Sequence, residues 1–473
     1  MNHAARLLPL VVALSLAGCA GIGPAYHRPD APPAAAWKEQ SAAAGWVPAT
    51  PGDTLDRGPW WSRFGDPALD ALAQRVQVSN QNIAAAVANY AQAEALVRQQ
   101  RAALLPSLSA SGSGRRSGGV GSDGTPASGA YSATLGASWT PDLWGRLRNT
   151  VDSAQASAQA SQADLASARL AAIGSLATDY FSLREADAEI ALLTQAIEGY
   201  ERSLAITQNR YNAGIAAQTD VLQARSQLLS TQADRVGVQR TRDTLEHAIA
   251  VLVGEAPAGF RLPAAPWVAS VPSVPLALPS LLLQRRPDIA SAERSVAEAN
   301  AQIGIARAAY FPTIDLTASI GGSSSRVGDL FSASSLLWAL GVSVAQTVFD
   351  GGAIDASVDA ARAAHTAQVA SYRQTVLSAF QAVEDQLSAV AALAAQEGLR
   401  REDSEVADRT EQQQLNRYRA AQISYTDVVT AQVAALTARR SLAQVQLARQ
   451  TAAIALIQAL GGGWEADWLA NPP

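Results

Sequence analysis

The feature that most limits how this chain can fold is an internal duplication. The stretch NRYNAGIAAQTDVL at 209–222 returns as NRYRAAQISYTDVV at 416–429. Residues 83–106 align in the same way with residues 289–312, and each of these stretches runs from an isoleucine to a proline over the same distance. Two copies are too few for a solenoid, so the duplication predicts one domain with internal pseudo-symmetry.

Each copy contains a segment in which apolar residues alternate with small or polar ones. The apolar positions are Leu108, Ala110, Tyr131, Ala133, Leu135, Ala137 and Trp139 in the first copy, and Ile314, Leu316, Ala318, Ile320, Leu336, Trp338, Leu340, Val342 and Val344 in the second. A period of two over this length predicts strands with one apolar face. Gly/Ser-rich loops at 112–130 and 321–335 separate the strands, so we expect two β-hairpins, at 107–140 and 312–346.

The apolar face of these hairpins indicates a membrane. No amphipathic helix pattern elsewhere in the chain is free to cover it, and aromatic residues lie near the strand ends. Strands of this kind, with serine and threonine on the opposite face, are typical of transmembrane β-barrels. Open sheet edges cannot exist in lipid and four strands cannot close a barrel, so the pattern predicts a barrel assembled from several chains. On periodicity alone, a four-stranded soluble sheet remains the alternative.

The long segments after each hairpin have helical spacing. A heptad series predicts coiled-coil helices at 146–253 and 352–460. Its members are Leu176, Leu183, Ile190, Ile197, Leu204 and Tyr211 on the outward helix, Ile215, Leu222, Leu229 and Val236 on the returning helix, and Val376, Val383 and Val390 in the second copy, where Glu397 breaks the phase. A continuous helix from Gly145 to Tyr211 would extend roughly 100 Å, a length that suits the periplasm better than a globular domain.

The N-terminus carries an export signal. An apolar run, LLPLVVALSLAGC, is too short to span a bilayer and has the length of a signal peptide, which we assign to residues 1–18. It ends in Leu-Ala-Gly-Cys, the pattern of a bacterial lipobox, so we expect Cys19 to become the lipidated first residue of the mature chain. An ordinary signal peptide with a chance cysteine is the alternative. Cys19 is the only cysteine, so no disulfide framework is expected.

Composition and motifs argue against several other functions. The net charge is −5 without a cluster of lysines or arginines, which argues against nucleic acid as a partner. The scattered histidines are His3, His27, His247 and His365, so we expect no metal site. GVGSDG at 119–124 satisfies a dinucleotide-binding pattern, but it lies in a hairpin loop, and no G-x-S-x-G or P-loop motif is present. We therefore expect no cofactor and no catalytic residue.

Four stretches carry a resemblance to a known family. They are WWSRFGDPALDAL at 60–72, RYNAG at 210–214, PSLLLQRRPDIASAERSVAEANAQIGIARAAYFPTIDLTASIG at 279–321 and ALGGGW at 459–464. In this order, and together with the duplication, they make the chain similar to the outer-membrane efflux family typified by TolC and OprM, especially its NodT-type lipoprotein branch. The resemblance covers nearly the whole mature chain.

This resemblance implies an α+β membrane protein in the bacterial outer membrane. Three chains would form a homotrimer with a twelve-stranded barrel, continued into the periplasm by a coiled-coil helical tunnel. Ala20, after the lipidated Cys19, implies sorting to the outer membrane. The implied divisions are a lipidated extended segment at 19–59, a first repeat at 60–255, a Pro-rich connector at 256–279, a second repeat at 280–460 and a tail at 461–473. The extended segment, connector and tail would form an equatorial belt.

The family resemblance also implies the function. Members of this family are exit ducts of tripartite pumps, joined by a periplasmic adaptor to an inner-membrane transporter, here expected to be of the RND type, and they are not enzymes. Two alternatives remain open: a duct for type I protein secretion, and a periplasmic coiled-coil scaffold or adaptor. The cargo is not predicted, although a single methionine gives no methionine-rich path for copper.

The repeated Asn-Arg-Tyr segments are expected to be the periplasmic tips, where a tunnel would close. We expect Asp427, and less so Asp220, to face the tunnel axis, and the arginine–tyrosine pairs to tie neighbouring tips together. These pairs are Arg210 with Tyr211 and Arg417 with Tyr418. The alternative is that both aspartates only cap the returning helices. Gly214 can end the first helix in a left-handed conformation, whereas the second copy has Ala421 there.

Overall fold

The computed structural model describes residues 22–30, 38, 59–118, 128–272 and 286–462. They belong to two compact units between which the chain passes several times. The first unit contains residues 1–31, 88–162 and 291–374, and the second contains residues 32–87, 163–290 and 375–473. Cys19 lies outside the described residues.

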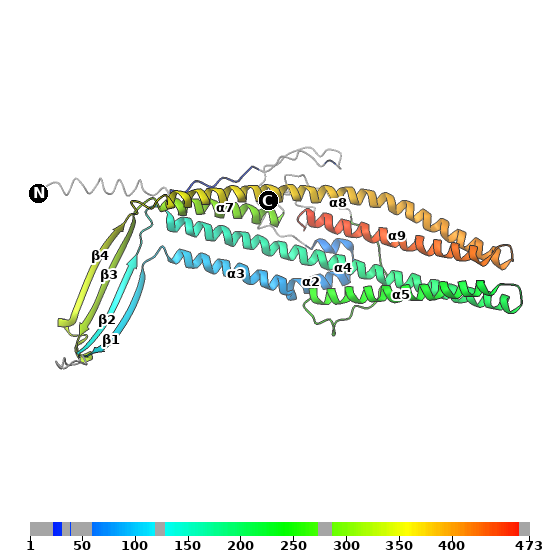
Figure 1. The fold of residues 1–473 in the computed structure, drawn as a ribbon, viewed down its shortest axis with the longest axis horizontal. Helices are drawn as coiled ribbons and strands as arrows, with labels where there is room; N and C mark the ends of the chain where they lie inside the picture. The colour runs from blue at the N-terminus through cyan, green and yellow to red at the C-terminus, as the bar shows by residue number, and fades with distance from the viewer. Residues whose placement is uncertain (1–21, 31–37, 39–58, 119–127, 273–285, 463–473) are drawn as a thin grey trace. The chain divides into compact units, whose positions relative to one another are not determined.

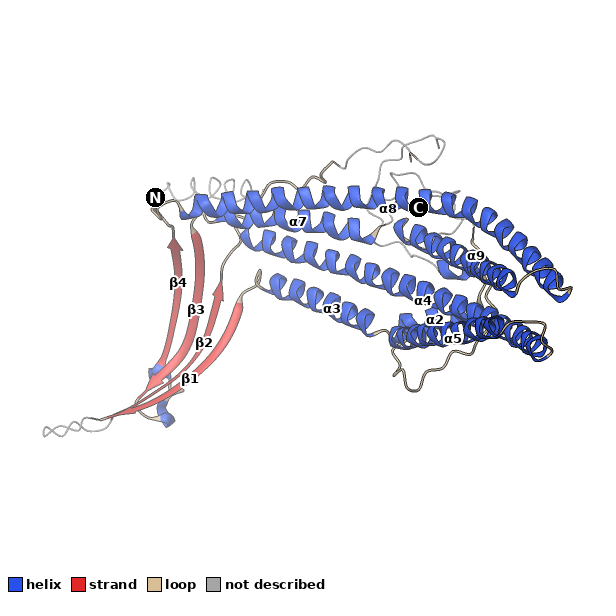
Figure 2. Ribbon diagram, turned by 45° about the vertical axis from the view of Figure 1, so that its right-hand side comes forward, coloured by secondary structure: helices blue, strands red, loops and turns tan. Residues whose placement is uncertain are grey.

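The first unit contains one antiparallel sheet, which both copies of the duplication build together. Its strands are β1 (Ser107–Ser117), β2 (Ser128–Trp139), β3 (Thr313–Ser324) and β4 (Leu336–Ala345). The order is β1-β2-β3-β4, so the two hairpins join through β2 and β3 (Figures 1 and 2). Two short 3₁₀ turns, Val327–Asp329 and Ala333–Ser335, lie between β3 and β4. The two predicted hairpins are therefore neighbours in a single sheet.

The register of the sheet gathers the alternating apolar residues on one face. One row across the four strands is Leu108, Ala137, Ala318 and Leu340, and another is Ala110, Leu135, Ile320 and Trp338. The row between two such rows is Ser109, Gly136, Ser319 and Ala339, on the opposite face. Leu108 is 70% exposed and Leu340 76% exposed, so the described part of the chain leaves most of the apolar face uncovered. The predicted strands with one apolar face are confirmed.

Two pairs of helices correspond to each other in the two copies. Helix α3 (Gln81–Ala102) precedes the first hairpin and α7 (Pro287–Ala308) precedes the second. After the hairpins come α4 (Arg146–Asn212) and α8 (Ala353–Arg419), each 67 residues long. Both long helices begin in the first unit and end in the second. No helix among the described residues is both long enough and apolar enough to cross a bilayer.

An aspartate caps the start of each long helix. Asp142 accepts hydrogen bonds from two backbone N–H groups of the first turn of α4, both at 2.9 Å. Asp350 accepts from the backbone N–H groups of Gly352 and Ile354 at the start of α8, at 2.9 and 2.7 Å. These N–H groups hold the pKa of Asp350 below its ordinary value. The strand-to-helix junctions thus use the same device in both copies.

The core of the second unit lies where short N-terminal helices pack on α4. The helices are η1 (Trp60–Phe64) and α2 (Pro67–Ser79), and the returning helices α5 (Gln218–Leu252) and α9 (Tyr425–Ala459) complete the packing. Leu69, Leu176 and Leu183 are fully buried there. Asp66 caps α2 through the backbone N–H of Ala68 at 2.9 Å and also accepts from the Tyr180 hydroxyl at 2.6 Å.

A buried ionic network attaches the Pro-rich connector to this core. Asp187 on α4 accepts from Arg184 at 2.9 Å and from Arg242 on α5 at 2.8 Å. Arg184 also donates to the carbonyl of Pro263 at 2.8 Å, and Glu246 accepts from the backbone N–H of Leu262 at 2.7 Å. The connector is therefore held at Leu262 and Pro263 by charged side chains, and these side chains also form ion pairs with one another.

The outward and returning heptads of the first copy have different environments. Leu176, Leu183 and Ile197 on α4 are buried within the second unit. The returning series is exposed in one chain: Ile215, in the turn before α5, is 66% exposed, and Leu222, Leu229 and Val236 on α5 are 58%, 54% and 67% exposed. Hydrophobic residues repeated every seven positions form a seam only against a partner helix. For α5, that partner is not in the described part of this chain.

Candidate functional site

The two Asn-Arg-Tyr segments form the turns that join the long helices to the returning helices, and both turns lie in the second unit. Gly214 has φ of 74° and Ala421 has φ of 61°, so both adopt the left-handed conformation. The backbone N–H that follows each of them bonds back to the arginine of the motif: Ile215 to Arg210 at 2.8 Å and Gln422 to Arg417 at 3.0 Å. The alanine of the second copy therefore forms the same turn as the glycine.

Arg210 links the two tips within one chain. Its Nη1 donates to the backbone carbonyl of Tyr418 at 2.8 Å, and its guanidinium carbon lies 4.5 Å from the centroid of the Tyr418 ring. The Arg210 Nε is buried and has no hydrogen-bond partner. A charged hydrogen bond and a cation–π contact thus converge on one arginine, which makes this the strongest polar contact between the two turns.

A second tyrosine, which the sequence did not single out, completes the contact. Tyr425 begins α9, is 1% exposed, and packs edge-on against Tyr418 with ring centroids 5.3 Å apart. Burial, and then the neighbouring Tyr418, raise the pKa of Tyr425 to about 12, so the hydroxyl stays neutral. The sequence carried no signal for Tyr425, because a heptad period describes one continuous helix and α8 ends before Tyr425 begins α9.

The two aspartates of the tips occupy the first turns of the returning helices. Asp427 accepts from the backbone N–H of Ser424 at 3.1 Å and from the Ser424 hydroxyl at 2.8 Å, and it is exposed. Asp220 holds the equivalent position on α5, but Ala217 stands at the N-cap and has no side-chain acceptor. Asp427 therefore has a capping role within its own chain, and its exposed carboxylate also carries a charge at the tip.

The other members of the two pairs do not meet in one chain. Tyr211 is 40% exposed. Arg417 is exposed, and its side chain donates a long hydrogen bond of 3.5 Å to Gln414 on its own helix. In the duplication, Arg417 is equivalent to Arg210, and Tyr211 is equivalent to Tyr418. Within one chain, however, only Arg210 and Tyr418 are joined.

A buried carboxylate pair lies further along α4 in the same unit. Glu189 pairs with Arg440 of α9, with Oε1 and Nε 2.5 Å apart. Glu185, one turn earlier, is 8% exposed, and burial together with the charge of Glu189 raises its pKa to about 7. No feature of the sequence distinguished this glutamate from the solvated acids of a coiled coil.

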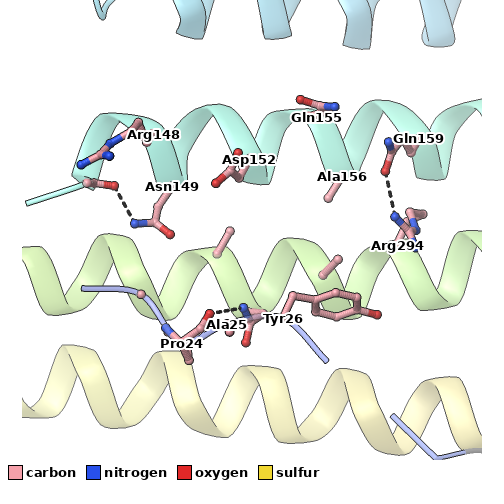
Figure 3. A pocket seen from close by; sticks show the side chains of 15 residues that line it. Pro24, Ala25, Tyr26, Arg148, Asn149, Asp152, Gln155, Ala156, Gln159 and Arg294 are labelled. Atoms are coloured by element: carbon pink, nitrogen blue, oxygen red, sulfur yellow. Dashed lines mark hydrogen bonds between the residues drawn. The ribbon is translucent and has the colours of Figure 1, made fainter. Parts of the chain in front are cut away.

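In the first unit, the segment that follows the expected lipidation site is bound to the helices. Asn300 of α7 donates to the carbonyl of Pro24 at 2.9 Å, and the hydroxyl of Tyr26 donates to the carboxylate of Glu293. A cleft of about 580 Å³ lies between this segment, α4 and α7 (Figure 3). Among the residues that line the cleft, Arg294 of α7 donates a hydrogen bond of 3.1 Å to the side chain of Gln159 on α4. The chain is thereby held in place within a few residues of Cys19.

In the part of the chain that the structure describes, no three His, Cys, Asp or Glu side chains gather so as to hold a metal ion.

Comparisons with known proteins place this architecture in a family. The model of the outer membrane efflux protein family matches residues 72–255 and again residues 278–462. The chain is 34% identical over 463 residues to the probable efflux pump outer membrane protein TtgC of Pseudomonas putida, covering 96% of this chain and 94% of TtgC. It is 31% identical over 464 residues to the cation efflux system protein CusC of Escherichia coli O6:H1, covering 97% of this chain and 99% of CusC.

Among solved structures, the open state of the MtrE outer membrane channel of Neisseria gonorrhoeae superposes on this chain with a TM-score of 0.81. The two chains are 28% identical, and the superposition covers 94% of this chain and 98% of MtrE.

Proposed function

This chain belongs to the outer membrane efflux protein family, and from that premise we propose that it is the outer-membrane exit duct of a tripartite efflux pump. The observation that carries the proposal is the four-stranded sheet with an exposed apolar face. In lipid, such a face needs no cover, but the free edges of β1 and β4 must be paired. Three copies joined edge to edge form a closed barrel of about twelve strands.

The exposed heptad series on α5 supports the same assembly. Ile215, Leu222, Leu229 and Val236 need a partner helix, and α8 offers exposed Leu399 and Val406 at the same seven-residue step. In a homotrimer, the returning helix of one protomer packs against the second copy of the next. The helices then form a periplasmic tunnel that continues the barrel.

The duct works with two partners, a periplasmic adaptor and an inner-membrane transporter of the RND type. The cargo follows from the transporter, and the relatives differ in this respect, because CusC is named for cation efflux and the TtgC of one Pseudomonas putida strain for toluene efflux. The chain itself has no enzymatic role. A type I secretion duct has the same architecture and is the second candidate.

The anchoring of the duct follows from its N-terminus. Cys19 is lipidated in the inner leaflet of the outer membrane, and the bound segment from Ile22 to Asp30 leads from the anchor along the first unit. The same proposal assigns the extended segment at 19–59, the connector at 256–279 and the tail at 461–473, most of which lie outside the described residues, to an equatorial belt of the trimer. The network of Arg184, Asp187 and Arg242 holds the connector in that belt.

Complementation tests the proposed function. The full-length chain, expressed with its own adaptor and transporter in a Gram-negative host without its native outer-membrane ducts, should restore efflux of a fluorescent dye and resistance to transported compounds. A Cys19→Ser variant should still form trimers but show weaker outer-membrane attachment. Restored secretion of a type I substrate without restored efflux would favour the second candidate instead.

At the tips, we propose a gate built from the duplicated arginine–tyrosine pairs. Arg210 binds the Tyr418 carbonyl within a chain. By the pseudo-symmetry of the two copies, Arg417 binds the Tyr211 carbonyl of the neighbouring protomer when the trimer is closed. Three links within chains and three between chains then hold six hairpins together. The carboxylates of Asp427, and with a weaker case those of Asp220, line the closed aperture. An adaptor opens the aperture because it binds the separated tips more tightly than the closed ones.

Cysteine pairs and conductance test this gate. Because Cys19 is the only native cysteine, oxidation of a Tyr211→Cys, Arg417→Cys variant should yield chains linked to one another on denaturing gels. The matched Arg210→Cys, Tyr418→Cys variant should form its disulfide within each chain, so its chains should still migrate as monomers on denaturing gels. In planar bilayers, Arg210→Gln and Arg417→Gln should each raise the resting conductance, whereas Arg202→Gln, an exposed arginine on α4, should not. An Arg417→Gln channel as closed as the unmodified one would contradict the link between protomers.

A further inference from the structure

The apolar face of the sheet is not uniform, because a cleft lies on it near the hairpin loops. Gly322, on the apolar side of β3, lies so close to the carbonyl of Leu330 that a Cβ there would collide with it, so the loop after β3 folds back onto this face. A cleft of about 490 Å³ opens between the loop and the sheet. Small residues such as Ala110, Gly112 and Ala133 form its floor, and the side chain of Phe331, 87% exposed, stands at its rim.

Two arginines lie beyond this cleft, at the ends of the strands. Arg116 is paired with Gly129 across β1 and β2, and its side chain is on the same face as Leu108 because the two residues have the same parity. A Cβ on Gly129 would lie 3.1 Å from the carbonyl of Ser325, so the chain beyond β3 passes close to this end of β2 just before Arg326, whose backbone is extended. Strands are about 4.8 Å apart and β2 lies between β1 and β3, so Arg116 is roughly 10 Å from the end of β3 that leads to Arg326.

The charges of these arginines are not neutralised within the described residues. Arg116 and Arg326 are both exposed, and among the described residues neither forms an ion pair, although Asp329 lies in the same loop as Arg326. Between the arginines and the cleft lies Tyr131, whose ring packs on Gly114 of β1. From the loop end inward, this face therefore presents guanidinium groups, a tyrosine, a small apolar cleft and then the aliphatic band.

That order is the order of groups in a lipid of the outer leaflet. The ends of the strands at Ser107, Trp139, Thr313 and Ala345 lead to the helices, so the hairpin loops lie at the outer surface if the helices are periplasmic. The phosphates of an outer-leaflet lipid lie at the level of the arginines, and its acyl chains extend inward past the cleft. Two cations at the same end of the sheet fit a headgroup with two phosphates better than one with a single phosphate.

We propose that this cleft, with Arg116 and Arg326, binds a bisphosphorylated, multiply acylated lipid of the outer leaflet, the lipid A part of lipopolysaccharide. The arginines bind its phosphates, and an acyl chain lies in the cleft beside Phe331. The proposal rests on the proposed placement of the sheet in the outer membrane. It gives each protomer one site, so a trimer carries three, spaced around the barrel.

The chain contains a matched control for the charge. Arg115 is next to Arg116 in sequence but points to the opposite, serine-bearing face of β1. Purified, delipidated trimers of the full chain should be titrated with bisphosphorylated lipid A and followed by native mass spectrometry. Lipid A should bind the unmodified and Arg115→Gln trimers alike and the Arg116→Gln, Arg326→Gln trimer at least about tenfold more weakly.

Other ligands and one more variant distinguish the contribution of the lipid headgroup to binding from that of the acyl chains. Monophosphorylated lipid A, phosphatidylglycerol and inorganic phosphate should each bind more weakly than bisphosphorylated lipid A. Phe331→Ser should weaken the binding of lipid A without changing that of inorganic phosphate. An equal loss in the Arg115→Gln trimer, or equal binding of phosphatidylglycerol, overturns the proposal. Conductance of the unmodified and the Arg116→Gln, Arg326→Gln trimers in bilayers without lipid A tests the duct separately, and it should be the same for both.

Discussion

Ala421 shows how one side chain can be accommodated in a turn that favours glycine. Its left-handed φ of 61° places a Cβ where Gly214 of the first copy has none. An L-residue in this conformation costs about 1–2 kcal/mol relative to a right-handed one, partly offset by the smaller entropy of the unfolded alanine. The second tip therefore holds a small amount of backbone strain that the first tip lacks.

We predict that Ala421→Gly stabilises the second tip by about 0.5–1 kcal/mol, because glycine adopts the left-handed conformation freely. Hydrogen exchange of the amides around residue 422 should become slower, while exchange at the first tip should not change. Gly214→Ala should have the opposite effect at the first tip. Faster exchange in the Ala421→Gly variant would show that the turn is held by other contacts.

Glu185 predicts a pH dependence of stability. Its pKa of about 7 in the folded chain lies above the ordinary value of 4.5, because burial disfavours the carboxylate and Glu189 adds negative charge. The folded chain thus binds this proton more tightly than the unfolded chain does. Stability contributed by the protonated group is complete below about pH 4.5 and is lost as the pH rises through about 7.

Glu185→Gln should therefore raise the melting temperature of the trimer at pH 8 and leave it nearly unchanged at pH 4.5. Thermal melting followed by circular dichroism measures both values. The control is Glu198→Gln, an exposed glutamate on the same helix, which should have little effect at either pH. A decrease in the melting temperature of Glu185→Gln at pH 8 would mean that the carboxylate is needed by Arg440.

At the scale of elements, Glu397 explains the break in the heptads of α8. It stands where Val376, Val383 and Val390 predict a fourth apolar residue, yet it is 6% exposed. Its carboxylate accepts from Arg449 of α9 at 2.7 Å and from Arg401 of its own helix at 2.5 Å. The coiled coil thus changes from apolar packing to a buried ion pair at this level, which restricts the register between α8 and α9.

Glu397→Gln should destabilise the packing of α8 on α9 by about 1–3 kcal/mol, because Arg449 would be left partly buried without a carboxylate. The exposed pair of Glu405 and Arg409, 3.8 Å apart, supplies the control, since Glu405→Gln should change stability by less than about 0.5 kcal/mol. Chemical denaturation of both variants makes the comparison. Equal effects would mean that the buried pair adds nothing beyond a surface pair.

At the scale of the whole molecule, the sheet is completed only by assembly. Its edge strands β1 and β4 have no partner among the described residues, and its apolar face is exposed. Lipid satisfies the face and neighbouring copies satisfy the edges, so insertion and trimer formation depend on each other. A change on the apolar face should therefore act on the yield of trimers in the membrane.

Leu340→Arg should sharply reduce the amount of trimer in the outer membrane, because an arginine facing lipid near the middle of a strand costs about 2–4 kcal/mol. Ala339→Arg is the matched control, because Ala339 directly precedes Leu340 on β4 and faces the opposite side of the sheet. It should be tolerated. Membrane fractionation with unheated gels measures both. Equal yields would assign the apolar face of β4 to a protein contact instead of lipid.

Much of the architecture was predictable because it follows from periodicity. A period of two placed the apolar face of the strands, and the duplication predicted that both copies have the same elements. The contacts between the two tips were less predictable. Arg210 and Tyr418 meet, but the sequence could not separate this pair from the equivalent Arg417 and Tyr211, which do not meet within a chain.

By itself, then, the sequence determined the two hairpins, the long helices and the turns at the Asn-Arg-Tyr segments, because local spacing encodes which face of an element is apolar. The tertiary structure decided which of the repeated residues pair. It joined Arg210 to the Tyr418 carbonyl, buried Tyr425 and Glu185, and left the heptads of α5 exposed. Contacts between residues about two hundred positions apart depend on how helices pack side by side, and a pattern along one helix carries no information about its neighbour.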